Sequence, residues 1–225
     1  MIPATLRYHV RRMFENTSTE EFQRNRKTGA LNIAALPTMS FNDRLFKRRQ
    51  ETAGVDSAVV ILIDVSASMF GTYNSSPESM NVFHAVQTAA ALLDTLHHAG
   101  VTTAVCTFGD EVSVLKPFDL HYRKAFPLLE GLTAGGGTND CAALSYAHRL
   151  LYGRHEARKV AFVITDGVGD REATYEQALT GARLGVTTIG VGIQHDVRRS
   201  YPINVRVDSL ADLGAVAFSK LKLAA

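Results

Sequence analysis

Two apolar runs without alternation, at residues 59–63 and 161–164, stand out along the chain. Such short continuous runs suit strands that are covered on both faces, as in a parallel sheet. From residue 55 onward, similar runs alternate with amphipathic segments of helical spacing. Alternating strands and helices predict a doubly wound, mostly parallel α/β sheet.

The same pattern sets the expected boundaries of the elements. Strands are expected at residues 101–107, 111–115, 159–165, 186–191 and 205–207, and helices at residues 80–99, 122–129, 139–152, 172–184 and 210–218. The Gly109-Asp110 pair predicts a tight turn, so the strand that follows it is expected to return antiparallel at one edge of the sheet. Residues 55–225 are therefore expected to form one domain.

Residues 1–54 form an N-terminal arm with a different composition. Helical spacing predicts a short helix over residues 6–14, and a cap at Ser18 or Thr19 predicts a second over residues 20–22. A turn of helix is expected at residues 33–36, and an extended segment at residues 45–49. The arm has too few apolar residues to fold alone, so we expect it to pack on the main domain.

Composition places the chain among ordinary globular proteins. Of its 225 residues, 46% are hydrophobic and 20% are charged. No apolar run is long enough to span a bilayer, and residues 1–16 lack the apolar core of a secretory signal. The two cysteines, Cys106 in a predicted strand and Cys141 at a helix start, are better explained as reduced thiols than as a disulfide. A cytoplasmic location is expected.

Charge is divided unevenly along the chain. The arm holds ten Lys/Arg and five Asp/Glu, whereas the remainder holds fourteen and seventeen, within a total of +2. The basic residues gather at Arg24, Arg26, Lys47, Arg48 and Arg49. Solvated surface is the common explanation for such a patch, but it could also face an acidic partner. The arm shows neither interleaved aromatic residues nor a nucleic-acid-binding motif. We therefore favour an acidic protein surface over nucleic acid as the partner.

Candidate chemistry begins where the first strand of the main domain stops. Asp64, Ser66 and Ser68 put a carboxylate and two hydroxyls at alternate positions, and a turn there can aim three oxygens at one point. Hard oxygen ligands with little charge among them suit Mg²⁺ or Mn²⁺, with waters completing the coordination. The alternative is a strand followed by an ordinary serine-rich turn.

Two later segments favour the metal site. Thr138 follows three glycines immediately before a predicted helix, and Asp166 follows the second buried strand. Ligands of doubly wound sheets sit beyond the carboxyl ends of the strands, so Asp64 and Asp166 are expected on one rim. The ordered set resembles the metal-ion-dependent adhesion site (MIDAS) of von Willebrand factor A domains. That resemblance assigns Asp64, Ser66, Ser68, Thr138 and Asp166 to the ion.

Other residues give weaker signals of chemistry. The chain lacks the P-loop pattern GxxxxGK[ST], and no spacing identifies a Ser-His-Asp triad. His195 and Asp196 follow a predicted strand on the same rim, where they could contact a partner or form an ordinary surface pair. Asp170 is better explained as a helix cap than as a ligand. Enzyme chemistry is not expected.

The C-terminal half permits a narrower comparison. The element GVGIQHDVRRSY at residues 190–201, with the stretches around it, resembles the end of the T subunit of aerobic cobaltochelatase. KTGALNIAAL in the arm resembles the lead-in to the von Willebrand A domain of that subunit. The chain departs from the family in its DVSASM and GGGTND motifs, and it shows no long acidic N-terminal region.

The resemblance implies a non-catalytic, metal-dependent binding subunit. Its partner would be a MoxR-like AAA+ ATPase of the cobaltochelatase S type, with a large chelatase subunit as a further partner through a Glu or Asp carboxylate. Cobalt insertion in cobalamin biosynthesis would be the process served. The alternatives are a stand-alone von Willebrand A adaptor of another AAA+ remodelling complex, including a phage one, and a metal-assisted hydrolase that uses the same aspartates.

Overall fold

The computed structural model describes residues 19–26, 30–31, 46–52, 56–70, 81–167 and 169–208. The chain divides into a unit of residues 15–55 and a larger unit that contains residues 56–225, and each is described by itself. No described helix is both long and apolar enough to cross a membrane. The expected helices over residues 6–14, 33–36 and 210–218 lie outside the described residues.

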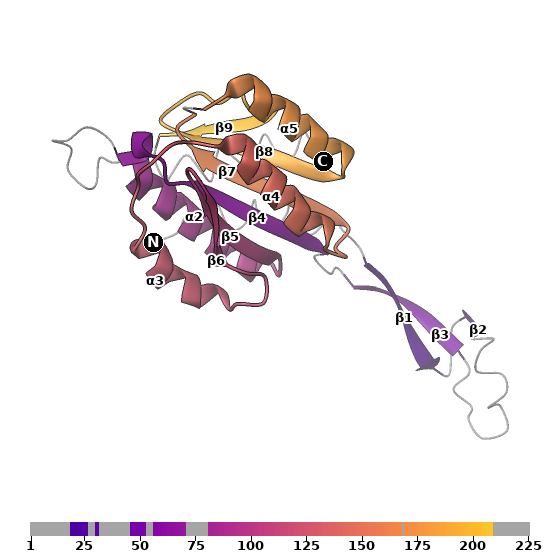
Figure 1. Ribbon diagram of the computed structural model, residues 1–225. Coiled ribbons are helices and arrows are strands. Elements are labelled where there is room, and N and C mark those ends of the chain that lie inside the picture. The colour runs from indigo at the N-terminus through magenta and orange to yellow at the C-terminus, as the bar shows by residue number, and fades with distance from the viewer. Residues whose placement is uncertain are drawn as a thin grey trace. The chain divides into compact units, whose positions relative to one another are not determined.

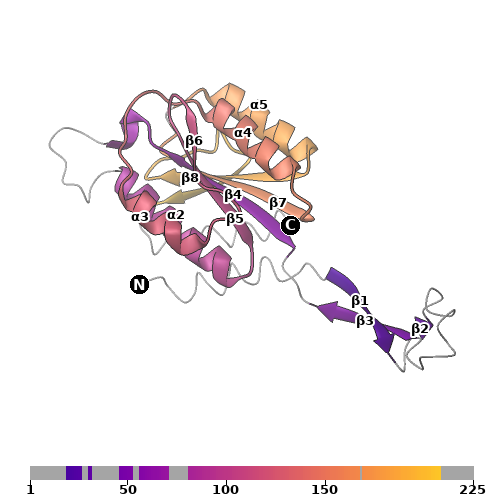
Figure 2. The same cartoon turned by 60° about the horizontal axis from the view of Figure 1, so that its bottom comes forward.

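The small unit is an antiparallel sheet of three strands in the order β1-β3-β2. Its strands are β1 (Thr19–Arg26), β2 (Ala30–Leu31) and β3 (Phe46–Thr52), seen in Figure 2. The short helix expected over residues 20–22 is wrong, because this segment is a strand that pairs with β3 from Thr19↔Thr52 to Arg26↔Phe46. A single turn of helix cannot match the hydrogen bonds of so long a ladder. The extended segment expected at residues 45–49 is confirmed over residues 46–49, which belong to β3, and residue 45 lies outside the described residues.

The larger unit is built on a sheet of six strands in the order β6-β5-β4-β7-β8-β9. All neighbouring strands are parallel except β5 and β6, which form the expected antiparallel hairpin at one edge. The strands are β4 (Ser57–Asp64), β5 (Thr102–Phe108), β6 (Val112–Lys116), β7 (Arg158–Thr165), β8 (Val186–Ile193) and β9 (Ile203–Val207). The predicted fold class is therefore confirmed.

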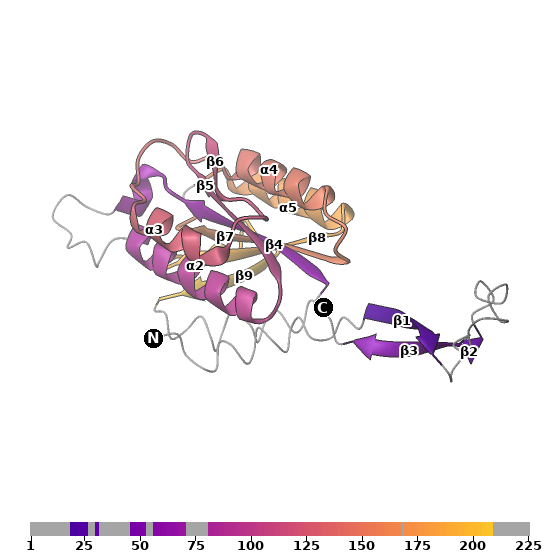
Figure 3. The same ribbon diagram turned by 90° about the horizontal axis from the view of Figure 1, so that it is seen from below.

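Helices cover both faces of this sheet. Figures 1 and 3 show α2 and α3 on one face and α4 and α5 on the other. The helices are α2 (Asn81–His98), α3 (Ala125–Glu130), α4 (Asp140–Tyr152) and α5 (Arg171–Arg183), with the short 3-10 helices η2 (Ala67–Phe70) and η4 (Tyr122–Lys124). The helix expected over residues 122–129 begins as η4 and continues as α3. Every residue of β4 is buried, as its unbroken apolar run predicts for a central strand.

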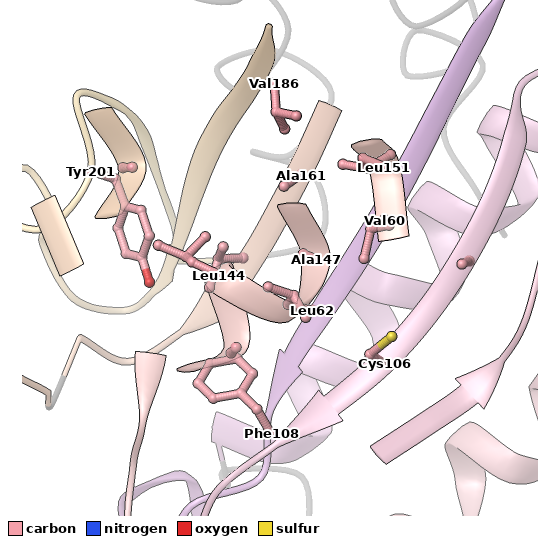
Figure 4. Packing of buried hydrophobic residues seen from close by; sticks show 14 of the residues in the cluster. Val60, Leu62, Cys106, Phe108, Leu144, Ala147, Leu151, Ala161, Val186 and Tyr201 are labelled. Carbon is pink, nitrogen blue, oxygen red and sulfur yellow. The ribbon is translucent and has the colours of Figure 1, made fainter. Parts of the chain in front are cut away.

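The core beneath α4 and α5 shows how the sequence pattern becomes packing. In Figure 4, Leu144, Ala147 and Leu151 of α4 face Val60 and Leu62 of β4. These helix positions are three or four residues apart, so they share one face of α4. The two strand positions are two apart and share one face of the sheet. The helix–sheet interface therefore follows from the two periodicities in the sequence.

The strand order places the site. The chain leaves β4 through α2 to β5, and it leaves β7 through α5 to β8 on the other side. Because β4 and β7 are neighbours and their outgoing connections diverge, their carboxyl ends border the switch point of the sheet, where α/β proteins bind ligands. Ile63 pairs with Ile164, so Asp64 and Thr165 come next to each other at that rim.

The glycines of β8 make room for the segment that follows the strand. A Cβ atom on Gly190 would overlap the ring of Tyr201, and one on Gly192 would overlap the carbonyl oxygen of His195. Tyr201 is fully buried, and its ring is visible beside Leu144 in Figure 4. Both glycines are thus explained by close approach of the chain to the strand.

Gly190→Ala is expected to destabilise the protein by about 1–3 kcal/mol, because the added methyl must displace a buried ring. Urea unfolding followed by circular dichroism measures this. Gly153→Ala is the control, since its Cβ would meet nothing closer than the Leu150 carbonyl oxygen at 3.9 Å, and its effect should stay within about 0.5 kcal/mol. Equal stability of the two variants would contradict this prediction, because it would show that the Tyr201 ring can shift without loss of stability.

Candidate metal site at the sheet rim

The site is built around the buried carboxylate of Asp64, the last residue of β4. Its Oδ1 atom accepts the backbone N–H of Ser66 at 2.9 Å, and its Oδ2 atom accepts the hydroxyl of Thr165 at 2.6 Å. Thr165 in turn accepts the N–H of Gly167 at 3.0 Å through the same hydroxyl oxygen. The carboxylate therefore bridges the ends of β4 and β7, which are 101 residues apart in sequence.

The two predicted serines continue from Asp64. Ser66 is buried and Ser68 is half-buried, and their Oγ atoms lie 3.1 Å apart. The backbone between them is already turning into η2, where the N–H of Met69 donates to the carbonyl of Ser66. The alternate spacing in the sequence thus brings both hydroxyls to one side of the turn.

Thr138 reaches the rim on the glycine loop, residues 135–137. The N–H of Gly135 donates to the carbonyl of Val65 at 2.8 Å, and the N–H of Ala67 donates to the carbonyl of Gly136 at 3.1 Å. These two bonds fasten the loop to the segment that carries Ser66 and Ser68. On its other side, the Thr138 methyl would lie 3.7 Å from a Cβ atom on Gly169, in the loop after Asp166.

Asp166 is buried one residue beyond β7, and its charge raises the pKa of Asp64. Desolvation by burial is the larger cause of that rise, and the hydrogen bonds from Ser66 and Thr165 oppose it. Asp64, Ser66 and Ser68 are therefore joined by hydrogen bonds, Asp166 is electrostatically coupled to Asp64, and Thr138 lies on a loop bonded to the same segment. The structure brings the five predicted residues to one rim.

Asp140 is a site residue that sequence reasoning missed. It is buried as the first residue of α4, and desolvation together with the charges of Asp64 and Asp166 raises its pKa to about 7. The hydroxyl of buried Tyr201 points at this carboxyl group and lowers its pKa through a hydrogen-bonding interaction, but the Asp140 Oδ1 atom and the Tyr201 hydroxyl do not reach the geometry of a regular hydrogen bond. An aspartate in the first turn of a helix is ordinary, so its sequence position carried no signal.

Thr165 was also missed, although its place at the end of a buried strand was predicted. A threonine is common in strands, and nothing local shows that its hydroxyl faces a carboxylate on another strand. The pairing of β4 with β7 supplies that information.

The donor set fits a hard divalent cation. Two carboxylates and three hydroxyls offer oxygen only. Desolvation by burial, and to a lesser extent the neighbouring carboxylates, raise the pKa values of Asp64 and Asp140, so their charged forms carry a cost that a cation would relieve. In the described part of the chain, no three His, Cys, Asp or Glu residues are grouped so that they could hold a metal by themselves. Any ion at this rim would therefore depend on the hydroxyls.

The other rim candidates have local explanations. Asp196 is exposed and ion-paired with Arg198, which lowers its pKa to about 2, and His195 Nδ1 lies 3.2 Å from the carbonyl oxygen of Ile193. These contacts fit the ordinary surface pair rather than a role at the ion. Asp170 caps α5 by accepting the N–H of Ala173 at 3.1 Å, as predicted.

Comparison with known proteins agrees with this geometry. Residues 59–168 match the family model of the von Willebrand factor type A domain, and this range begins in β4 and ends just past Asp166. The chain contains a von Willebrand factor type A domain. The matched range includes all five predicted ligands.

Individual known proteins are similar to this chain in sequence or in structure. A curated relative is the E3 ubiquitin-protein ligase WAV3 of Arabidopsis thaliana, 28% identical over 167 residues, which are 72% of this chain. The alignment spans only 21% of that relative. An aerotolerance-related membrane protein from Bacteroides fragilis superposes with a TM-score of 0.61 at 17% identity, covering 74% of this chain and 99% of that one.

A third comparison concerns the metal. Proximal thread matrix protein 1 from the mussel byssus superposes with a TM-score of 0.57 at 20% identity, covering 75% of this chain and 45% of that one. Its structure has a zinc-occupied MIDAS motif. At such identities the superpositions show the von Willebrand A fold alone.

Asp140→Asn is expected to stabilise the metal-free protein at pH 8 by about 2–4 kcal/mol, because a tenfold change in an ionisation constant corresponds to about 1.4 kcal/mol. The pKa of Asp140 is raised from 3.8 to about 7, so the wild type loses stability as pH rises through this range. The gain should fade toward pH 4, where both side chains are neutral. Urea unfolding in EDTA between pH 4 and pH 8 measures it.

The control for this prediction is Asp208→Asn, an exposed aspartate beyond β9. It should show no comparable gain because its charge is exposed to solvent and paired with Arg206 at 2.8 Å. A stabilisation by Asp140→Asn that grew as pH fell would contradict the burial of a raised-pKa carboxyl at this position.

Proposed function

We propose that this chain is a non-catalytic, cation-dependent protein-binding module. The observation that carries the proposal is the buried carboxylate of Asp64, which is hydrogen-bonded to the backbone of Ser66 beside the Ser66–Ser68 hydroxyl pair, at the switch point of the sheet. Asp64, Ser66, Ser68, Thr138 and Asp166 would hold Mg²⁺ or Mn²⁺. The zinc-occupied motif of the mussel protein supports a divalent cation at this place in the fold.

A bound divalent cation would supply an open coordination position that attracts a carboxylate from a partner. The chain itself supplies the frame. The Asp64 carboxylate is held by the turn after β4 and by the end of β7, so it cannot rotate without breaking hydrogen bonds to both Ser66 and Thr165. Because the site is ordered by folding, partner binding would not have to order it.

The neighbouring carboxylates also affect how a partner carboxylate could approach the rim. Asp140 adds a third acidic group that is coupled to Asp64 and Asp166, so the rim without a cation repels an incoming carboxylate. A partner Glu or Asp would therefore be accepted only with the cation in place. This makes the binding conditional on the ion, which is the property expected of an adhesion-type site.

A binding role accounts for the rim better than hydrolysis does. His195 and Asp196 are the histidine and aspartate that follow β8, and both are engaged within their own loop. These contacts support the assignment as a module without turnover.

The narrower proposal is a MoxR-like AAA+ ATPase as the partner, in a complex of the cobaltochelatase type or in another remodelling complex. It is supported by the sequence resemblance of residues 190–201 and of the arm to the T subunit of aerobic cobaltochelatase. Gly190, Gly192 and Tyr201 in this stretch already have a packing role, so the resemblance there is compatible with other partners. A Glu or Asp on the ATPase, or on a large chelatase subunit, would be the sixth ligand.

Asp64→Ala is expected to remove Mn²⁺ binding, with affinity at least about tenfold weaker, because the residue that anchors the ligand-bearing turn is lost. Isothermal titration calorimetry measures the affinity, and circular dichroism verifies that the fold survives. Asp196→Ala is the matched control, since it removes an exposed rim carboxylate that is paired with Arg198. Unchanged Mn²⁺ affinity in Asp64→Ala would show that the ion, if bound, lies elsewhere.

Binding of the chain to a purified MoxR-like ATPase is expected to need Mg²⁺ and to be lost on addition of EDTA. Ser66→Ala and Asp166→Ala should abolish it, whereas Asp196→Ala should not. Replacing one partner Glu or Asp by Gln or Asn should have the same effect as EDTA, because the carboxylate is the proposed ligand. A pull-down in which the complex survives chelation would leave no binding role for the cation.

A further inference from the structure

Asp110 makes a long-range contact with the glycine loop. It lies in the turn between β5 and β6, and its Oδ1 atom accepts the backbone N–H of Gly137 at 2.9 Å, 27 residues later in the chain. None of the sequence signals for the metal site includes Asp110, whose aspartate–glycine neighbourhood is sufficiently explained by a tight turn.

The glycines opposite Asp110 leave space for its carboxylate. A Cβ atom on Gly137 would lie 2.7 Å from Asp110 Oδ1, and one on Gly136 would overlap Oδ2. Gly136 also has a φ of 78°, a conformation that residues with a side chain rarely adopt. The run of three glycines therefore forms a socket for the Asp110 side chain as well as a tight turn.

Thr138 lies between Gly137 and Asn139, and both of these residues are hydrogen-bonded to the turn between β5 and β6. The N–H of Gly137 is bonded to the Asp110 carboxylate, and the N–H of Asn139 donates to the carbonyl of Gly109 at 3.1 Å. The backbone on both sides of Thr138 is thus held by the Gly109-Asp110 pair. Gly135 and Gly136 connect the same loop to the turn that carries Ser66 and Ser68.

We propose that Asp110 is a positioning residue for the cation site, which acts through the Gly137 N–H to hold Thr138 beside Ser66 and Ser68. This inference rests on the proposed function of the site. Asp110 itself would not touch the ion. Its hydrogen bond would order the glycine loop during folding, so that the entropy cost of ordering Thr138 does not weaken cation binding.

A positioning role differs from a charge effect in a measurable way. Asp110→Ala removes both the acceptor and the charge, whereas Asp110→Asn keeps an acceptor oxygen of the same shape and removes only the charge. If Asp110 positions the loop, Asn should restore most of the affinity that Ala loses. If Asp110 acted only by attracting the cation through space, Asn and Ala would be equally weak.

The experiment is Mn²⁺ titration by calorimetry of the wild type, Asp110→Ala and Asp110→Asn. The expected dissociation constant of Asp110→Ala is about tenfold higher than that of the wild type, as for other residues that orient metal ligands. Asp110→Asn should lie within about threefold of the wild type. On a Thr138→Ala background, Asp110→Ala should add less than about twofold, because the ligand that it positions is already missing.

The effect of Asp110→Ala is also measured in a second variant, Asp166→Asn. Asp166 comes from the end of β7 rather than from the glycine loop, so Asp110→Ala should retain its full effect there. Hydrogen exchange without metal gives an independent readout: the Gly137 amide should exchange about tenfold faster in Asp110→Ala than in Asp110→Asn. A merely structural role would change the unfolding midpoint but would not depend on Thr138.

Three results would overturn the inference. They are an unchanged Mn²⁺ affinity in Asp110→Ala, equal weakness of the Ala and Asn variants, and full additivity of Asp110→Ala with Thr138→Ala. A wild-type protein that binds no Mn²⁺ would instead overturn the proposed function, and the positioning role at the ion would fall with it. The two failures are therefore distinguishable from the wild-type titration alone.

Discussion

The burial of the Asp64 carboxylate is the constraint on which the rim depends. A buried charge is costly unless its lone pairs are used, and here the Ser66 N–H and the Thr165 hydroxyl use one on each oxygen. Desolvation still raises the pKa of Asp64, so these bonds offset the cost only in part. A polar group in this state is suited to binding a cation, because neutralisation of its charge would be favourable.

The loops around Asp64 are joined to one another by backbone hydrogen bonds. The segment after β4, the turn after β5 and the glycine loop exchange backbone hydrogen bonds through Val65, Gly109 and Gly136. Glycine is needed at 136 and 137 because the Asp110 carboxylate occupies the space of a side chain. A binding surface made of loops can in this way be as well ordered as the strands that carry it.

Packing and partner recognition make different demands on the C-terminal part of the domain. Gly190, Gly192 and Tyr201 belong to the stretch that resembles a chelatase subunit, and contacts inside the domain account for all three. Specificity for a partner therefore has to come from residues exposed at the rim. The three aspartates Asp64, Asp140 and Asp166 are buried beneath that surface, and their mutual repulsion makes an incoming carboxylate dependent on the cation.

The sequence by itself determined the alternation of strands and helices, the antiparallel edge and the order of the five oxygen-bearing residues, because periodicity and strand-end position are local properties. The strand over residues 19–26 was missed, since pairing with β3 overrides a weak local preference for helix. Thr165, Asp140 and Asp110 became visible only in three dimensions. Thr165 and Asp110 bond to residues at least 27 positions away, and Asp140 is coupled to two distant aspartates. Such contacts depend on which strands and loops become neighbours in the fold.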